Sequence, residues 1–248
     1  MIFEDLQMKH CDMFSLDGFA SLPDASIDAV ITDLPYGTLN KRNTWDQCIN
    51  LPLFWKEIHR VCKEIAAIVT TSQMPYTAEL VSSNYAHFKY CWVWEKSKAT
   101  GYLNAKKQPL RAHEDICVFY KKQCKFNPIF SIGLPYNKGK AIRDTLAYGK
   151  QEKAILVKND SGLRYPRTVL YFKTAESEGK YHPTQKPLAL FQYLIQTYTD
   201  PGDLILDPCF GSGTTAIACQ TLGRKFIGFE KEKQFYQKAL IRISRKSL

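Results

Sequence analysis

The residues with the clearest capacity for chemistry lie in the stretch ITDLPYGT, where an apolar run ends in a carboxylate and an aromatic turn follows. Asp33 and the backbone carbonyl of Leu34 are neighbouring hydrogen-bond acceptors, and Pro35 stiffens the turn that presents them. Tyr36 adds a planar ring on which another flat ring could stack. Two acceptors beside an aromatic face suit a flat ring that carries an amino group. A turn that merely ends a strand is the alternative interpretation.

A second candidate site is the glycine turn in LILDPCFGSGTTAIAC. Gly211, Gly213 and Ala216 have the spacing of a dinucleotide-binding turn, and Glu230 follows about 20 residues later, where a carboxylate receives ribose hydroxyls. Glycine is required where the backbone must approach a ligand more closely than a Cβ atom allows. Asp207 argues against a nicotinamide cofactor, because it adds an acceptor where a pyrophosphate needs none. An ordinary tight turn is the alternative.

Both candidate sites follow stretches that we expect to be buried strands, because their apolar residues run together or alternate. The predicted strands cover residues 26–33, 64–72, 88–96, 113–122, 203–207 and 224–230. Helical spacing predicts helices over residues 51–63, 78–85, 187–199 and 214–222, with Pro187 at the start of one and Gly223 after the end of another. Little chain follows the glycine turn, so most strands of its sheet must come from earlier in the sequence.

The middle of the chain is different in pattern. Between residues 124 and 181 the periodicity fades while Pro, Gly, Tyr and Lys accumulate, and long irregular segments in compact domains are usually functional or mobile. We therefore predict one domain built from residues 1–123 and 182–248, with an inserted region at 124–181.

The net charge of +10 is concentrated in this middle part. Residues 96–181 hold 18 Lys and Arg against 7 Asp and Glu, whereas the remainder holds 16 against 17. A nearly neutral body with a basic segment predicts an electrostatic footprint for a polyanion such as nucleic acid. A solvated lysine-rich surface is the alternative.

The composition argues against several other classes of protein. The eight cysteines and five histidines show neither C-x-x-C pairs nor zinc-ligand spacing, so we expect no metal site. No apolar run approaches the roughly 20 residues that span a bilayer, and no targeting segment is evident. We expect a soluble, intracellular protein.

Three motifs together, DLPYGT near the N-terminus and HPTQKP and DPCFGSGTT near the C-terminus, resemble the β class of S-adenosylmethionine-dependent DNA amino methyltransferases. The resemblance covers the chain except its middle. It implies a Rossmann-like α/β fold with permuted motif order: a seven-stranded, mostly parallel sheet with helices on both faces, in which the strands ending at Asp33 and Asp207 are neighbours. It further implies that residues 124–181 recognise the target. A cytoplasmic, nucleoid-associated protein encoded by a bacterium or phage is implied as well, with restriction-modification as the associated process. The sequence leaves open whether a partner restriction enzyme exists, and a homodimer is compatible with the resemblance.

The resemblance also assigns a cofactor site. S-adenosylmethionine would be bound by Asp12, Asp33, Thr184, Lys186, Asp207, Phe210, Gly211, Gly213, Thr214, Thr215 and Glu230. Asp12 would lie near the cofactor's adenine and Glu230 would bind its ribose. Thr184 and Lys186 would face the methionine moiety, whose carboxylate favours a cation. Helix capping is the alternative role for Asp12 and Thr184.

The implied catalytic residues are Asp33, Leu34, Pro35 and Tyr36. An exocyclic amino group is a poor nucleophile because its lone pair is delocalised into the ring. Hydrogen bonds to Asp33 and to the Leu34 carbonyl would draw the nitrogen toward pyramidal geometry, and Tyr36 would stack on a base that has left the duplex. Leu34 stands where the family usually has a second proline, so the turn loses one rigid element.

The implied activity is methylation of the N6 amino group of adenine in double-stranded DNA, because relatives that act on cytosine N4 more often have Ser in place of Asp33. N4-cytosine methylation is the alternative. An RNA or glutamine methyltransferase would have a motif resembling N-P-P-Y, and a noncatalytic nucleic-acid binder would have no reason to keep all three motifs. The recognition sequence cannot be read, since several side chains are chemically able to contact base edges: Asn127, Arg143, Asn159, Arg164 and Arg167.

Overall fold

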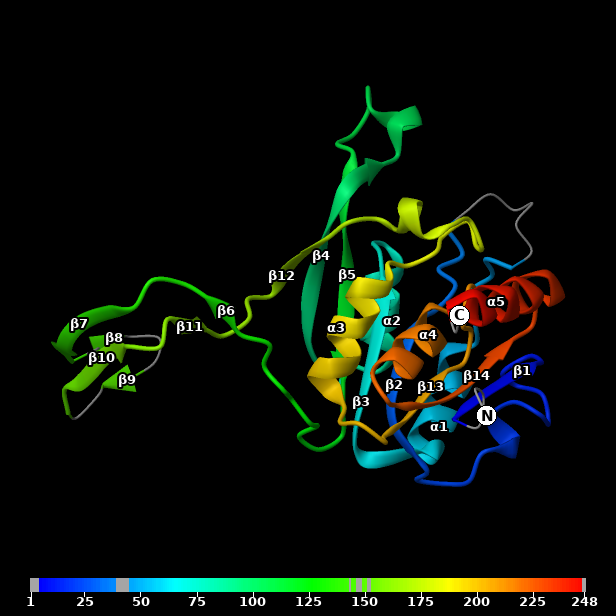
Figure 1. The fold of residues 1–248 in the computed structure, drawn as a ribbon, viewed down its shortest axis with the longest axis horizontal. Helices are drawn as coiled ribbons and strands as arrows, with labels where there is room; N and C mark the ends of the chain where they lie inside the picture. The colour runs from blue at the N-terminus through cyan, green and yellow to red at the C-terminus, as the bar shows by residue number, and fades with distance from the viewer. Residues whose placement is uncertain (1–4, 39–44, 143, 146–148, 151–152, 247–248) are drawn as a thin grey trace. The chain divides into compact units, whose positions relative to one another are not determined.

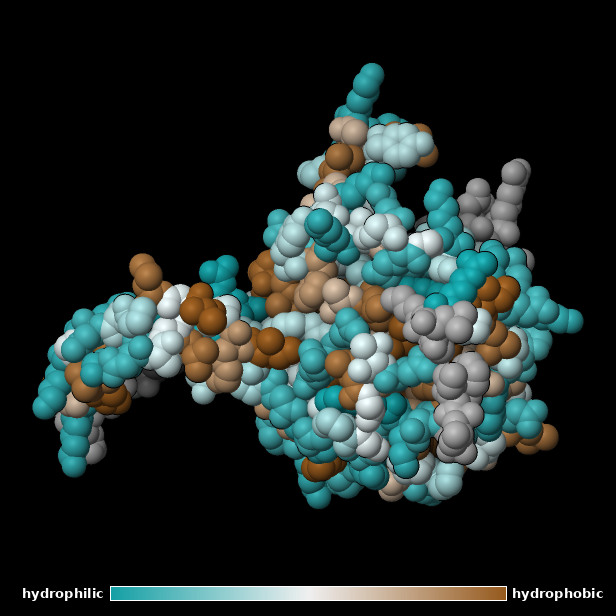
Figure 2. Space-filling view, viewed as in Figure 1, coloured by the Kyte–Doolittle hydropathy of each residue, from teal (hydrophilic) through white to brown (hydrophobic). Residues whose placement is uncertain are grey.

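The computed structural model describes residues 5–38, 45–142, 144–145, 149–150 and 153–246. The chain divides into two compact units. The larger unit comprises residues 1–127 and 168–248, and the smaller unit comprises residues 128–167. Hydrophilic residues cover much of the visible surface, with apolar residues between them (Figure 2).

In its described residues, the larger unit contains an eight-stranded sheet in the order β1-β14-β13-β2-β3-β5-β4-β12 (Figure 1). The strands are β1 (Leu6–His10), β2 (Ile27–Asp33), β3 (Cys62–Ser72), β4 (Phe88–Thr100), β5 (Arg111–Phe119), β12 (Val169–Phe172), β13 (Leu204–Asp207) and β14 (Lys225–Glu230). Neighbouring strands are parallel except that β5 is antiparallel to both β3 and β4. The predicted mostly parallel α/β sheet is confirmed.

Helices cover both faces of this sheet. They are α1 (Leu51–Val61), α2 (Tyr76–Ser83), α3 (Leu188–Tyr198), α4 (Thr214–Thr221) and α5 (Lys233–Lys246), with single 3₁₀ turns at Phe19–Ser21, Tyr102–Asn104 and Ala175–Glu178. Successive strand residues point to opposite faces. Ile31 accordingly packs with residues of α3, α4 and α5, whereas Val30 packs with residues of α1 and α2.

The predicted number of strands in the sheet was wrong, because the described residues of the larger unit form a sheet of eight strands rather than seven. The additional strand is β12, which extends the sheet by pairing in parallel with β4 from Val169 opposite Val93. The Trp94 indole donates a hydrogen bond to the carbonyl of Phe172 at 3.0 Å. A four-residue edge strand is too short to show an alternating pattern in the sequence.

The smaller unit consists of short antiparallel strand pairs. They are β6 (Ser131–Ile132) with β11 (Leu163–Arg164), β7 (Tyr136–Ala141) with β10 (Ile155–Asn159), and β8 (Asp144–Thr145) with β9 (Gly149–Lys150). Arg143, one of the candidates for base contacts, lies outside the described residues. The assignment of residues 124–181 to target recognition stays a prediction.

Among the described residues, no helix combines the length and hydropathy that a membrane span requires. Within the same ranges, no group of three or more His, Cys, Asp or Glu side chains is arranged to hold a metal ion.

Candidate active site

The turn that follows Asp33 and the glycine turn that follows Asp207 meet at the edge of the sheet where the parallel strands have their carboxyl ends. β13 pairs in parallel with β2 on one side and with β14 on the other, so these strands end side by side at Asp33, Asp207 and Glu230. The prediction that the strands ending at Asp33 and Asp207 are neighbours is therefore confirmed. A cavity of about 910 Å³ opens at this edge, as expected where ligands bind to open α/β sheets.

Of the predicted site residues, all except Gly213 line this cavity: Asp12, Asp33, Leu34, Pro35, Tyr36, Thr184, Lys186, Asp207, Phe210, Gly211, Thr214, Thr215 and Glu230. Their individual roles in binding and catalysis remain predictions, but the fold brings these distant segments to one place.

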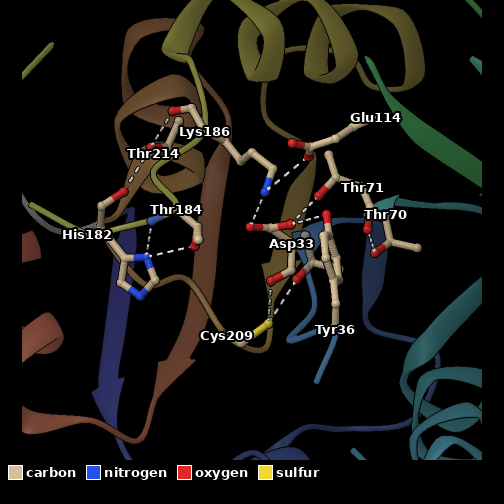
Figure 3. A network of polar contacts seen from close by, with 12 residues as sticks. Asp33, Tyr36, Thr70, Thr71, Glu114, His182, Thr184, Lys186, Cys209 and Thr214 are labelled. Atoms are coloured by element: carbon tan, nitrogen blue, oxygen red, sulfur yellow. Dashed lines mark hydrogen bonds and ion pairs between the residues drawn. The ribbon is translucent and has the colours of Figure 1, made fainter. Parts of the chain in front are cut away.

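Asp33 is the centre of a polar network (Figure 3). Its Oδ1 accepts hydrogen bonds from the hydroxyl of Tyr36 at 2.8 Å and from the hydroxyl of Thr71. Its Oδ2 accepts from Nζ of Lys186 at 2.6 Å. The carboxylate is thus fixed in orientation while one acceptor position on Oδ2 remains for another donor.

Lys186 lies between two carboxylates. Its side chain is only 7% exposed, and Nζ is 2.6 Å from Asp33 and 3.5 Å from Oε2 of Glu114. Burial alone would lower the pKa of the Lys186 ammonium, but the charges of Asp33 and Glu114 outweigh burial and raise it. Glu114 in turn lies 3.3 Å from Nζ of Lys96. The site therefore holds charges of alternating sign.

Tyr36 is held by its ring as well as by its hydroxyl. The ring stacks on Tyr76 with centroids 5.3 Å apart, and the Lys186 ammonium lies 5.4 Å from its centroid. Burial, together with the charges of Asp33 and Glu114, raises the pKa of Tyr36 well above its ordinary value. The phenol therefore stays protonated and continues to donate to Asp33.

The turn after Asp33 is fixed by backbone contacts. Asp46 Oδ1 accepts hydrogen bonds from the backbone N–H groups of Tyr36 and Gly37, both at 3.0 Å. Gly37 has φ +65°, and a Cβ atom there would lie 2.3 Å from Sγ of Cys48, so only glycine fits. The Leu34 side chain is buried in the core, and no described residue donates a hydrogen bond to its carbonyl.

The glycine turn is tied to Glu230. The backbone N–H of Gly211 donates to Oε2 at 2.9 Å, and that of Glu232 donates to Oε1 at 2.8 Å. Burial raises the pKa of Glu230. Each oxygen can accept one more hydrogen bond. A Cβ atom at Gly211 would point toward the ring of His182 at 3.6 Å, on the cavity side.

Gly213 is the one predicted site residue that does not line the cavity. At φ +74°, a Cβ atom there would lie 3.1 Å from Cβ of Ala239 in α5. Glycine at this position therefore allows close packing of α5, and the role of Gly213 in cofactor binding stays a prediction.

The HPTQKP segment places His182 and Thr184 at the cavity. His182 Nδ1 accepts from the backbone N–H of Thr184 at 3.2 Å and contacts its hydroxyl at 3.1 Å. Burial lowers the pKa of His182 to about 4, so the ring is neutral at physiological pH. Its centroid lies 4.8 Å from that of Trp45 and 4.1 Å from that of Phe235. Thr184 does not cap α3, which begins at Leu188.

Asp12 and Thr214 make local contacts at the same cavity. The Asp12 carboxylate accepts from the backbone N–H of Phe14 at 2.9 Å, which stabilises a turn and caps no helix. The Thr214 hydroxyl donates to the carbonyl of Lys186 at 3.2 Å and so connects the glycine turn to the HPTQKP segment. Phe210 is buried beside Phe226.

A family model described as DNA methylase, for the N6/N4 methyltransferases, matches residues 27–241. The chain belongs to the N6/N4 DNA methylase family. This methylase is 27% identical over 240 residues to the Type II methyltransferase M.HpaI of Haemophilus parainfluenzae, a match that covers 92% of this chain and 72% of that protein.

Two solved structures share the fold of this methylase. The crystal structure of the M1.HpyAVI-SAM complex has a TM-score of 0.65 and 24% identity, covering 96% of this chain and 98% of that one. The PvuII DNA methyltransferase, described as cytosine-N4-specific, has a TM-score of 0.66 and 20% identity, covering 95% and 85% of the two chains.

The buried Asp207 side chain stabilises the methylase's glycine turn by hydrogen bonds. Its side chain accepts hydrogen bonds from the hydroxyls of Thr32 at 2.7 Å and Thr215 at 2.5 Å and from the backbone N–H of Cys209 at 3.2 Å. The residue is 2% exposed, and burial raises the pKa of Asp207 to about 7.

This burial predicts a pH-dependent stability. Between the ordinary Asp pKa of about 4 and the folded value of about 7, the folded state holds a proton that the unfolded state has released. The free energy of unfolding should therefore decrease as the pH rises through this range. Asp207→Asn resembles the protonated acid but does not titrate, so we expect it to remove roughly 2–4 kcal/mol of that decrease. Urea unfolding of both proteins across this range measures the difference, and equal pH dependence would contradict the account.

Several site residues had no motif in the sequence. Thr71 and Asp46 contact the end of β2 and the turn that follows it, and Glu114 contacts Lys186. Trp45 lies against His182. One signal could have identified Glu114. It lies near the start of β5, and an antiparallel strand brings its first residues to the edge where the parallel strands end.

Proposed function

We propose that this DNA methylase transfers a methyl group from S-adenosylmethionine to the N6 amino group of adenine in double-stranded DNA. The observation that carries the proposal is the meeting of Asp33 and the Leu34 carbonyl with the Gly211 turn and Glu230 in one cavity of about 910 Å³. One part of this cavity has acceptors for an amino group, and another has acceptors for a sugar.

The residues around the glycine turn fit the cofactor. Glu230 keeps two acceptor positions after binding the N–H groups of Gly211 and Glu232, and a ribose offers two hydroxyl donors. The missing side chain at Gly211 leaves room beside His182. Bound S-adenosylmethionine supplies a methyl group on a positively charged sulfur.

Asp33 prepares the amino group for attack. Oδ2 keeps one acceptor position beside Lys186, and the Leu34 carbonyl has no donor among the described residues. Accepting both amino hydrogens localises the nitrogen lone pair. Hydrogen bonds from Lys186, Tyr36 and Thr71 fix the orientation of the Asp33 carboxylate, which reduces the reorganisation needed for reaction. The surplus amino proton leaves toward Asp33 and solvent.

The target base must leave the duplex to reach this cavity, at a cost of a few kcal/mol. Tyr36 offers an aromatic surface, and its position is held by the stacked ring of Tyr76. The excess of Lys and Arg in residues 96–181 supports binding to the phosphate backbone, and residues 124–181 are the proposed target-recognition region.

The choice of adenine rests on Asp33, and cytosine N4 is the second candidate because both bases present an amino group beside a ring nitrogen. Nucleoside mass spectrometry of duplex DNA incubated with the protein and S-adenosylmethionine should detect N6-methyladenine. N4-methylcytosine alone would overturn the base assignment and leave the mechanism intact. No modified base on genomic DNA of varied sequence would contradict the proposed function.

A further inference from the structure

The hairpin formed by β4 and β5 extends beyond the edge of the sheet that carries the active site (Figure 1). The two strands are paired as far as Thr100 opposite Arg111, and the tip is formed by residues 101–110. On the two strands next to the tip, the side chains of Lys96, Thr100 and Arg111 line the cavity. The tip therefore projects from the rim of the cavity that a target base has to enter.

Two large apolar side chains are exposed at this tip. Tyr102 is 78% exposed and Leu103 is 83% exposed, and both lie in the 3₁₀ turn Tyr102–Asn104. Gly101 allows the sharp start of this turn with φ +90°, and a Cβ atom there would contact nothing within 4 Å. The tip thus presents an adjacent aromatic and aliphatic side chain that the fold leaves uncovered.

The outer part of the hairpin, residues 96–112, is also strongly basic. Residues 96–112 contain Lys96, Lys98, Lys106, Lys107 and Arg111 and no acidic residue. Lys96 and Lys98 are paired with carboxylates near the base of the hairpin, whereas no described acidic residue pairs with the other three. Figure 2 shows hydrophilic and hydrophobic residues mixed at this tip.

We propose that the tip of this hairpin is a wedge that enters duplex DNA beside the target base. Leu103 and Tyr102 would occupy the space left in the base stack when the base moves into the cavity, while Lys106 and Lys107 contact the flanking phosphates. Apolar side chains inserted between base steps are a known way to stabilise distorted DNA. The inference rests on the proposed function, because it requires a base to leave the duplex.

Charge and position favour DNA over a protein partner. A run of cations without one acidic residue complements a polyanion, and the tip adjoins the cavity that needs an extruded base. The wedge also supplies what the cavity residues do not: it stabilises the duplex from which the base has departed.

The test compares Leu103→Ala with Tyr85→Ala. Tyr85 is 76% exposed and precedes β4, so it lies at the opposite edge of the sheet. The methylated site is first mapped in DNA modified by the unaltered protein. Rates of methylation at low DNA concentration are then measured on a duplex with that site and on one lacking the base opposite the target. Thermal melting checks that each variant is folded.

We expect Leu103→Ala to slow methylation of the fully paired duplex about tenfold. On the duplex that lacks the opposing base, its methylation rate should be within about threefold of that of the unaltered protein, since an unpaired base is extruded more easily. Tyr85→Ala should match the unaltered protein on both. Equal losses on the two duplexes, or no loss on either, would overturn the wedge and leave the methylase function standing. If the unaltered protein methylates neither duplex, both the proposed function and the proposed wedge are contradicted.

Discussion

Asp33→Asn is expected to slow methyl transfer by roughly 10³-fold, because it removes the charged acceptor of the target amino group. The substitution keeps the shape of the side chain. Its amide oxygen can still face Lys186, and the hydroxyls of Tyr36 and Thr71 can rotate to accept from its NH₂ group. The loss should therefore appear in turnover and not in folding.

Lys186 explains why this variant should stay folded. Breaking a buried ion pair usually destabilises the fold, because one charge is left without a partner. In Asp33→Asn the Lys186 ammonium still has Glu114 as a partner, at 3.5 Å. Asp28→Asn is the matched control, since Asp28 lies on the same strand and pairs at 2.7 Å with Lys63 far from the cavity. We expect cooperative melting for Asp33→Asn, at a temperature close to that of the control. Activity within tenfold of the unaltered protein would remove Asp33 from the catalytic role.

The second large effect is expected from Glu230→Ala, which should weaken binding of S-adenosylmethionine by about 100-fold or more. Each hydrogen bond to a charged group contributes about 1.5–3 kcal/mol, and Glu230 has acceptor positions for two ribose hydroxyls. Isothermal titration calorimetry with S-adenosylmethionine measures the change without requiring a DNA sequence.

Glu64→Ala is the control for this measurement, because Glu64 is an exposed acid near the start of β3, at the other edge of the sheet. It should bind the cofactor as the unaltered protein does. A Glu230→Ala affinity within about threefold of the control would exclude the ribose assignment. Gly213→Val is unsuitable for this purpose, because its side chain would push against Ala239 and disturb α5.

Much of the fold could be predicted from the sequence. The strands ending at Asp33, Asp207 and Glu230 each combine an apolar run with a polar end, and parallel strands bring such ends to one edge. The short edge strands β1 and β12 gave no comparable signal. β1 reads LQMKH, and β12 has only four residues, so neither shows a hydrophobic period long enough to recognise.

The site was less predictable than the fold, because its contacts join residues far apart in the chain. Lys186 was expected to face the cofactor, and the structure pairs its ammonium with Asp33 and Glu114. Spacing could not distinguish Gly211 from Gly213 either. Only the packing of α5 shows that one glycine faces the cavity and the other a helix.

The central claim is that a methyl group passes from S-adenosylmethionine to a base amino group held by Asp33. The most direct measurement is a single-turnover reaction of duplex DNA with S-adenosylmethionine carrying a trideuterated methyl group, followed by nucleoside mass spectrometry. The account predicts a trideuterated methyl group on the exocyclic nitrogen of adenine with the unaltered protein, formed roughly 10³-fold more slowly by Asp33→Asn. Absence of label from the DNA while the cofactor is bound, or equal rates for the two proteins, would contradict it.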